Sequence, residues 1–393
     1  MESNCIEQNN MLIKLVLFFI FTYAIYIIIK NTLTKQSEYF IEQNYIEQNN
    51  ETKNQNTFNR TQCKYIIPVN LQKVLDMNGI KHAEKPTIFM PCTYDATNDE
   101  IKKMDDGAKY YFIINNIDEI ISKERLWIGL ISYYGEDGAK ILSPMTYLLN
   151  KKSDLNKLID DMNLKSNSKK LYILKNNNQR QEGLRIINTP NTSFSNYLIA
   201  QELLQDPYLI DGRKINLRVY ILVVCSRQTK SVYVYNDGFM YYTKEPFVKG
   251  SIEFGPNITT GYIDRTVYET NPLTHGDFKK YLKSQNKNPD KVFNRIYLML
   301  SYVMEPFIVT NKICGGKFKD RTSFQLLGAD VALDVNLYPK IMEINKGPDM
   351  DSKDIRDGDL KLACISDMFK VLGIIPTNNS EHNGFITIMH YDQ

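Results

Sequence analysis

The chain has 393 residues, of which 43% are hydrophobic and 24% charged, a composition typical of a globular protein with room for two or three subdomains. The formal net charge is only +3, and no basic run with interleaved aromatic residues occurs, so we predict no nucleic-acid partner. The six cysteines are widely spread without a Cys-x-x-Cys pair, which predicts neither a zinc site nor a disulfide framework.

A strongly apolar segment lies near the amino terminus. Residues 11–29 are interrupted only by Lys14 and Thr22, and about 20 apolar residues suffice to span a bilayer. We predict a single-pass signal-anchor helix at 11–29, behind a tail at 1–10; a cleaved secretory signal is the alternative, but no small-x-small cleavage site follows. Lys30 and Lys35 give a slight positive-inside bias, which places the large domain in the cytosol.

The next segment is polar. Residues 36–70 are rich in Asn, Gln and Glu, and a short Ile-Glu-Gln-Asn repeat begins at Ile41 and again at Ile46. Such a composition cannot bury enough apolar surface to offset the entropy of ordering the chain. We therefore predict a flexible tether over residues 30–84.

From Pro86 onward the pattern becomes globular. Strands are predicted at residues 87–91, 110–114 and 141–147, and a helix capped by Ser153 at 153–162. These elements predict a small N-terminal α/β subdomain at 85–170.

A strand and hairpin follow at residues 171–187. The first strand ends in Lys175, a polar loop comes next, and a second strand begins at Gly183. Taken alone, this pattern indicates a polar hairpin tip with a solvated lysine.

Lys214, Asn216 and Arg218 alternate along the next predicted strand and therefore share one face of it. Val219 and Ile221 begin the opposite, apolar face. The polar face has two interpretations, a basic strand in contact with water or a face that binds an anion, for which a guanidinium is a suitable partner.

Residues 324–345 read as two strands joined by a turn. With a four-residue loop at 335–338, Asp330 lies opposite Glu343, and Asn345 shares the face of Glu343. Carboxylate and amide oxygens suit Mg²⁺, which also keeps places for water and phosphate. The alternative is an edge hairpin with its polar side chains in water, but the surrounding residues are too apolar for a solvated ribbon.

Two long segments resemble motifs of the tubulin-tyrosine ligase-like enzymes, a family of ATP-grasp amide ligases. They are QELLQDPYLIDGRKINLRVYIL, beginning at Gln201, and LLGADVALDVNLYPKIMEINKGP, beginning at Leu326. The resemblance covers roughly residues 85–376. It implies an α/β (α+β) ATP-grasp fold, with a catalytic domain at 171–376, a closing helix after Asp357 and a C-terminal tail at 377–393.

The resemblance also implies roles for individual residues. Lys214 and Arg218 are the expected catalytic residues, with Arg218 on the transferred phosphate or the substrate carboxylate. Mg²⁺ is expected on Asp330, Glu343 and Asn345. ATP is expected to contact Lys175, Arg180, Gly183, Leu184, Gln201, Glu202, Leu203, Leu204, Lys214, Asn216, Thr259 and Thr260.

Several positions depart from the family pattern. Gln181 replaces a glycine of the phosphate-covering loop, and Asn216 replaces an aspartate. Tyr241 or Tyr242 stands near the position of an arginine that contacts the substrate carboxylate, and Asn257 stands where the family has histidine. These changes put the usual acceptor clamp in doubt.

The expected activity is an ATP- and Mg²⁺-dependent amide ligation through an acyl phosphate. Its expected partners are a free amino acid (glutamate, glycine or tyrosine) and a protein carboxylate, with a tubulin tail as one candidate acceptor. Two alternatives stay open: a ligase with a non-tubulin acceptor, and a catalytically degenerate membrane-anchored ATP-grasp protein that only binds a partner.

Overall fold

The computed structural model describes residues 55–60, 67–92, 107–164, 170–176, 183–315, 321–377 and 382–392. The chain divides into two compact units, one of residues 56–74 and 81–393, the other of residues 1–55 and 75–80. In the unit of residues 1–55 and 75–80, the structure describes Gln55, the end of helix α2 (Val69–Met77) and a turn at Gly79, whose φ is +64°. The predicted membrane helix at 11–29 lies outside the described residues and stays a prediction.

The first unit is built on a large sheet, which has eleven strands among the described residues. Its centre is antiparallel, in the order β11 (Thr229–Thr243), β10 (Arg213–Cys225), β13 (Thr322–Leu333) and β14 (Pro339–Asn345). Beyond them β12 (Thr259–Thr260) and β15 (Phe385–Asp392) pair with β11, and β9 (Leu209–Ile210) pairs with β10. The predicted strand at 214–218 and the hairpin at 324–345 thus lie side by side.

Four short parallel strands extend this sheet from β13: β4 (Tyr110–Tyr111), β3 (Ile88–Phe89), β1 (Thr57–Asn59) and β2 (Lys81–His82). The structure differs here from the predicted boundaries. The tether does not reach residue 84, strands β3 and β4 join the same sheet as β13, and the expected tail at 377–393 contains β15. Short strands with one or two buried side chains, such as Phe58 in β1, leave little periodic signal.

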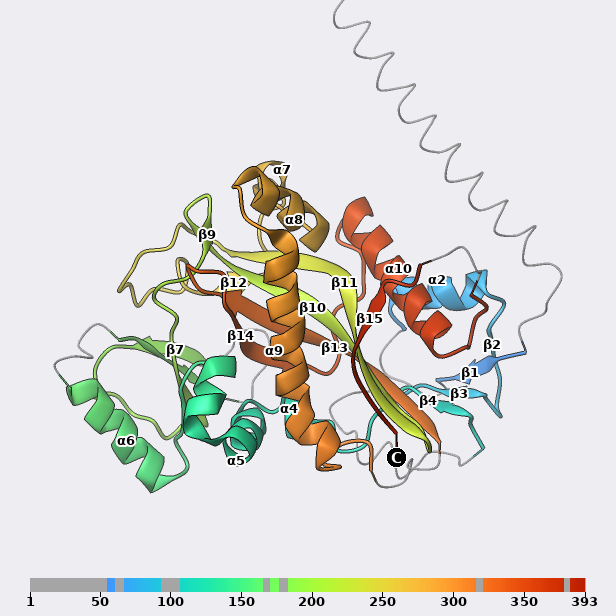
Figure 1. Cartoon of the computed structure of the whole chain (residues 1–393), viewed down its shortest axis with the longest axis horizontal. Coiled ribbons are helices and arrows are strands. Elements are labelled where there is room, and N and C mark those ends of the chain that lie inside the picture. The colour runs from blue at the N-terminus through green and yellow to red at the C-terminus, as the bar shows by residue number, and fades with distance from the viewer. Residues whose placement is uncertain are drawn as a thin grey trace, which may run out of the picture. The chain divides into compact units, whose positions relative to one another are not determined.

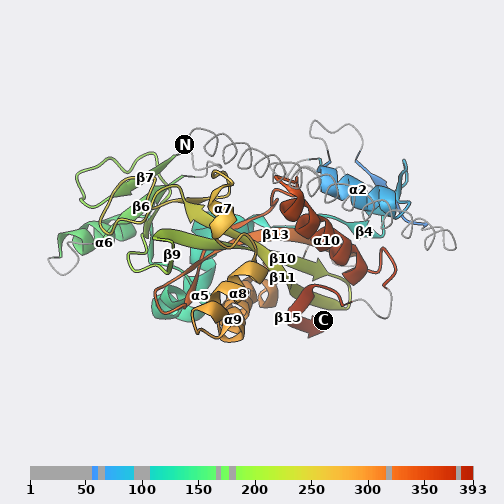
Figure 2. The same cartoon turned by 90° about the horizontal axis from the view of Figure 1, so that it is seen from above.

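Helices cover both faces of the central strands (Figures 1 and 2). Helices α8 (His275–Ser284), α9 (Pro289–Val309) and α5 (Lys123–Leu142) lie on one face, and α10 (Ile355–Val371) lies on the other. Short helices α4 (Asp118–Ile121) and α7 (Val267–Thr270) precede α5 and α8 in the chain. The closing helix is found where it was predicted.

Helix α9 is a core helix. Asn288 caps it by accepting from the backbone N–H of Lys291 at 3.0 Å, and Pro289 occupies its first turn. Its length and composition would allow it to cross a membrane, but 56% of its most apolar stretch is buried. Phe307 and Leu300 are fully buried against the sheet.

A second, antiparallel sheet has the order β5 (Thr146–Leu148), β8 (Ile199–Glu202), β6 (Tyr172–Lys175) and β7 (Leu184–Ile187). Helix α6 (Lys152–Asn163) packs on it through Leu158 and Met162. Two predictions were wrong in detail. Residues 141–142 end α5 rather than begin a strand, and α6 begins at Lys152 without a cap from Ser153.

A disulfide joins Cys225, the last residue of β10, to Cys314, which follows α9. Cys92 is disulfide-bonded as well. The prediction that the cysteines form no disulfide framework is therefore wrong for these residues, whereas Cys364 is free and buried. The Cys225 and Cys314 partners are 89 residues apart in sequence, so their spacing carries no motif and only the fold brings them together.

Gly238 marks a close approach of β11 to its neighbours. It lies opposite Val219, and a Cβ built on it would meet the Arg218 carbonyl at 2.3 Å and the His275 ring at 2.5 Å. We expect Gly238→Ala to lower the free energy of unfolding by about 1–3 kcal/mol through overpacking, measured by denaturant titration. Gly315→Ala is the control, because its Cβ would make an ordinary 3.4 Å contact. Equal stability of the two variants would contradict the packing described.

Candidate functional site

Asp330 and Glu343 are directly opposite each other in the β13–β14 hairpin. Leu333 pairs with Pro339, so the loop has five residues, 334–338, instead of the predicted four. A bulge at Met342 offsets the extra loop residue, which restores the predicted register at the carboxylates. Asn345 follows opposite Gly328, and its Nδ2 lies 3.4 Å from Glu343 Oε1.

Arg218 reaches the carboxylate pair from the neighbouring strand. It lies opposite Asp330 in the β10–β13 register and donates to it twice, from Nε to Oδ1 at 2.6 Å and from Nη2 to Oδ2 at 3.1 Å. The ring of Tyr241 lies 5.0 Å from the guanidinium, on the strand beyond. The structure thus distinguishes the two tyrosines, because the hydroxyl of the fully buried Tyr242 donates instead to the Pro272 carbonyl.

Lys175 enters the site from the second sheet. The buried Nζ donates to Gln201 Oε1 at 2.8 Å, and Gln201 Nε2 donates to Thr146 Oγ1 at 3.1 Å. This chain of side chains from β6, β8 and β5 fixes the ammonium group. The interpretation of Lys175 as a solvated hairpin lysine is therefore wrong.

Lys214 and Asn216 complete the polar face of β10. Lys214 is buried, and its Nζ donates to the Leu204 carbonyl at 3.2 Å. The Oδ1 of Asn216 is buried and has no hydrogen-bond partner among the described residues. An acceptor buried without a partner costs stability unless a ligand satisfies it, so this amide marks a place where a donor group of a ligand would fit.

The charges of the site perturb one another. Burial lowers the pKa of Lys175 to about 8, although the charge of Glu343 opposes the shift. Burial also lowers the pKa of Lys214 to about 8, and the charge of Lys175 adds to it. Burial raises the pKa of Asp330 to about 6, against the opposing effect of Arg218. Three groups with shifted pKa values in one place are typical of a functional site.

Lys123 is a site residue that the sequence analysis missed. Burial would raise the pKa of Glu343, but the charges of Lys175, Lys123 and Arg218 lower it on balance. Lys123 is the first residue of α5, whose start is fixed by Ser122 accepting from the Arg125 N–H. No motif surrounds Lys123, and only the packing of α5 against β14 brings it near Glu343.

The other residues predicted to contact the nucleotide lie in different local environments. Gly183 has φ +70°, and a Cβ there would collide with Asn176, so the turn into Leu184 requires glycine. The N–H groups of Glu202 and Leu203 donate to the Met145 and Leu171 carbonyls, so these two donors are already occupied.

Two further predictions concern the loop before β7 and strand β12. Arg180 lies outside the described residues. Thr259 and Thr260 form β12 at the far edge of β11, where the Thr260 hydroxyl accepts from the Tyr262 N–H at 3.0 Å. The hydroxyl of Thr260 therefore stabilises a turn in this structure.

The donor set at the hairpin fits magnesium. In the described part of the chain, no group of three or more His, Cys, Asp or Glu side chains is arranged to hold a metal ion. Asp330, Glu343 and Asn345 instead offer two carboxylates and an amide, and Mg²⁺ is usually held by one or two carboxylates, with water and phosphate as its other ligands. Each Asp330 oxygen that accepts from Arg218 keeps a further lone pair for a cation.

An antiparallel sheet with a buried lysine and a mixed sheet with paired carboxylates define a mixed α/β protein consistent with the ATP-grasp fold. The model of the tubulin-tyrosine ligase family matches residues 102–382. The chain belongs to this family, which confirms the resemblance seen in the sequence.

Individual relatives are more distant. The probable tubulin polyglutamylase TTLL9 of Rattus norvegicus is 28% identical over 185 residues, which cover 44% of this chain and 38% of the relative. The tubulin polyglutamylase TTLL5 of Mus musculus is 25% identical over 283 residues, 65% of this chain and 20% of the relative. The tubulin monoglutamylase TTLL4 of Mus musculus is 26% identical over 286 residues, which cover 66% of this chain and 23% of the relative. The matched region thus spans well under half of each relative.

The electrostatic coupling in the site is directly testable. We expect the side chains of Lys175 and Lys214 to titrate near pH 8 in an NMR titration of the lysine side chains. In Glu343→Gln the pKa of Lys175 should fall further, because the carboxylate charge that raises it is removed. The pKa of Lys214 should not fall with it, since Glu343 is not among the groups that shift it, and should instead rise as Lys175 loses its charge. An unchanged pKa of Lys175 would mean that the two sheets do not meet at this point.

Proposed function

We propose that the chain is an ATP- and Mg²⁺-dependent ligase that joins an amino acid to a protein carboxylate. The observation that carries the proposal is the meeting of Lys175, from one sheet, with Arg218, Asp330 and Glu343, from the other. Phosphoryl transfer to a carboxylate concentrates negative charge, and catalysis then consists largely of neutralising it in a fixed geometry. Membership of the family supports such a ligase in general.

The proposed reaction has two steps. The γ-phosphoryl group of ATP passes to the acceptor carboxylate, giving an acyl phosphate and ADP. The amine of the incoming amino acid then attacks the acyl carbon, forms the amide, releases phosphate and gives up a proton. Neither step requires a side-chain nucleophile. Mg²⁺ held by Asp330, Glu343 and Asn345 would neutralise charge on the phosphates.

The protein side chains have distinct proposed tasks. Lys175 and Lys214 hold phosphates. Burial lowers their pKa values, and a bound phosphate would favour their protonated, positively charged forms. The unpartnered Oδ1 of Asn216 accepts from a ribose hydroxyl or from the incoming amine. Arg218 shifts part of its bonding from Asp330 to the transferred phosphoryl group or a carboxylate, for which a guanidinium is well suited.

We propose glutamate as the transferred amino acid. Relatives are named tubulin polyglutamylases and a tubulin monoglutamylase, which makes glutamate the first candidate and tubulin the first acceptor to test. A different acceptor is the second candidate, because Tyr241 occupies the place beside Arg218 where the family pattern has an arginine. A neutral ring there would bind a carboxylate less strongly than a cation does.

Nucleotide binding should depend on the hairpin carboxylates. Calorimetry of ATP with the native chain should show binding that requires Mg²⁺, and Glu343→Ala or Asp330→Ala should remove this Mg²⁺ dependence. Glu269→Ala, an exposed carboxylate on α7, is the control and should bind as the native chain does. Far-ultraviolet circular dichroism checks that the variants are folded. Mg²⁺-dependent binding that survives in Glu343→Ala would contradict the site.

Turnover should follow the same residues. With ATP, Mg²⁺, labelled glutamate and a glutamate-rich tubulin tail peptide, we expect label in the peptide and equal amounts of ADP and phosphate. Glycine and tyrosine are tested in parallel. Lys175→Met should reduce turnover by at least about a hundredfold, the size usual for a lost charge-stabilising group. A native chain that binds ATP but transfers none of these amino acids would favour the binding-protein alternative.

A further inference from the structure

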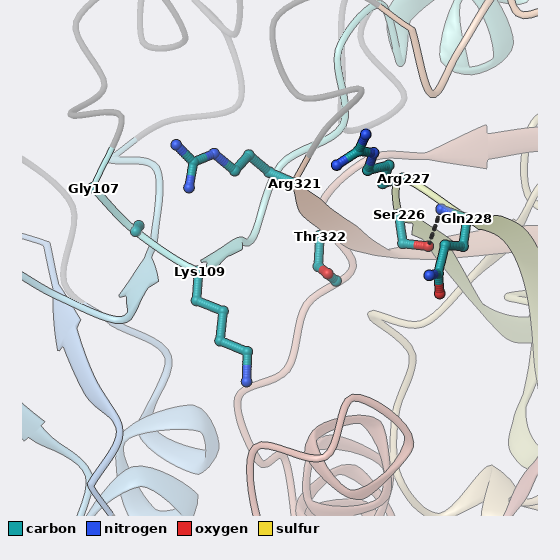
Figure 3. A pocket seen from close by; sticks show the side chains of 8 residues that line it. Gly107, Lys109, Ser226, Arg227, Gln228, Arg321 and Thr322 are labelled. Atoms are coloured by element: carbon teal, nitrogen blue, oxygen red, sulfur yellow. Dashed lines mark hydrogen bonds between the residues drawn. The ribbon is translucent and has the colours of Figure 1, made fainter.

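A second polar pocket lies at the other end of the central strands. It has a volume of about 400 Å³, and its lining includes Lys109, Ser226, Arg227, Gln228, Arg321 and Thr322 (Figure 3). We call it the distal basic pocket. Along their strands, Arg218 and Asp330 are each eight or nine residues from this lining, roughly 26–30 Å at the rise of a β-strand, so this pocket is separate from the carboxylate site.

Sheet pairing brings the lining together. Thr322 pairs with Tyr110, which follows Lys109, and Ser323 pairs with Cys225, which precedes Ser226. The basic residues therefore project from the ends of three neighbouring strands, β4, β13 and β10. Their positions are fixed by backbone ladders rather than by long connections.

The turn that carries Arg227 is also well defined. The Ser226 N–H donates to the Thr229 carbonyl at 2.8 Å, and Ser226 Oγ accepts from the N–H groups of Gln228 and Thr229 at 3.2 and 3.0 Å. The Cys225–Cys314 disulfide holds the strand directly before it. A ligand that binds Arg227 would therefore order little additional backbone.

Among the residues that the structure describes, the lining carries three positive charges and no carboxylate. Lys109, Arg227 and Arg321 form no ion pair with any residue that the structure describes. Some exposed cations elsewhere do, as in the pairs Lys249–Asp206 and Lys140–Glu136. Uncompensated cations around one hollow raise the local concentration of anions.

We propose that the distal basic pocket binds an acidic stretch of the protein acceptor, at a distance from the residue being modified. The link to the acceptor rests on the proposed function, whereas binding of an acidic peptide does not. Two guanidinium groups suit carboxylates bidentately, and about eight or nine residues of extended chain span the distance to Arg218. A peptide is favoured over a membrane surface because the lining includes no large apolar side chain that would insert into lipid.

Direct binding tests the pocket without turnover. The probe is a fluorescein-labelled hexaglutamate peptide, with hexaglutamine as the neutral counterpart, and binding to the full chain is followed by anisotropy at low salt. We expect Arg227→Gln/Arg321→Gln to weaken hexaglutamate binding about tenfold, in keeping with two exposed charge contacts. Lys280→Gln/Lys283→Gln removes the same charge from exposed positions on α8 and should bind as the native chain does.

Three outcomes would overturn the proposal: equal hexaglutamate affinity in the native chain and Arg227→Gln/Arg321→Gln, an equal loss in the α8 control, or Arg227- and Arg321-dependent binding of phosphatidylserine vesicles without peptide binding. The link to the acceptor is tested with two substrates, one carrying an acidic run about eight or nine residues from the modified glutamate and one lacking it. In Arg227→Gln/Arg321→Gln, KM should rise only for the first, with kcat and ATP affinity unchanged. A chain with no turnover but normal hexaglutamate binding would overturn the ligase and leave the pocket standing.

Discussion

The ion pair between Arg218 and Asp330 is the contact on which the site depends. It joins β10 to β13 at the centre of the large sheet, where both side chains are largely removed from water. Removing one partner of such a pair leaves an uncompensated charge, which is strongly unfavourable, whereas the intact pair adds little net stability. Net stability therefore does not explain why this ion pair lies in a mostly apolar part of the ladder. Ligand binding explains it better, because a ligand can interact with both charged groups.

The unliganded site holds its groups in unfavourable electrostatic states. Burial lowers the pKa values of Lys175 and Lys214 and raises that of Asp330, so the charged form of each group is disfavoured by its surroundings. A polyphosphate with a divalent cation supplies the missing opposite charges to both sets at once. Ligand binding would therefore relieve the unfavourable free energy of burying these groups. A ligand that donates a hydrogen bond to Asn216 Oδ1 would relieve the cost of that buried acceptor in the same way.

The sequence predicted the parts of the site that lie within one or two strands. Side-chain alternation placed Arg218 on a polar face, and the hairpin pattern placed Asp330 opposite Glu343 even though the loop length was wrong, because a bulge compensated for it. Lys123 and the Cys225–Cys314 pair escaped prediction since only tertiary packing brings them to their partners. Strand boundaries in the polar N-terminal region failed because short strands with few buried side chains lack a period.

A single ladder connects the two sites. Strands β10 and β13 pair continuously from Asn216 to Cys225, so the carboxylate site and the distal basic pocket are fixed relative to each other by the same backbone hydrogen bonds. A rigid spacing of this kind selects acceptors by length as well as by charge, because two linked contacts reinforce each other only when the linker spans them. The acceptor place beside Arg218 is occupied by the neutral ring of Tyr241, so recognition of acidic residues at a distance would supply part of the specificity that a local cation supplies in the family pattern.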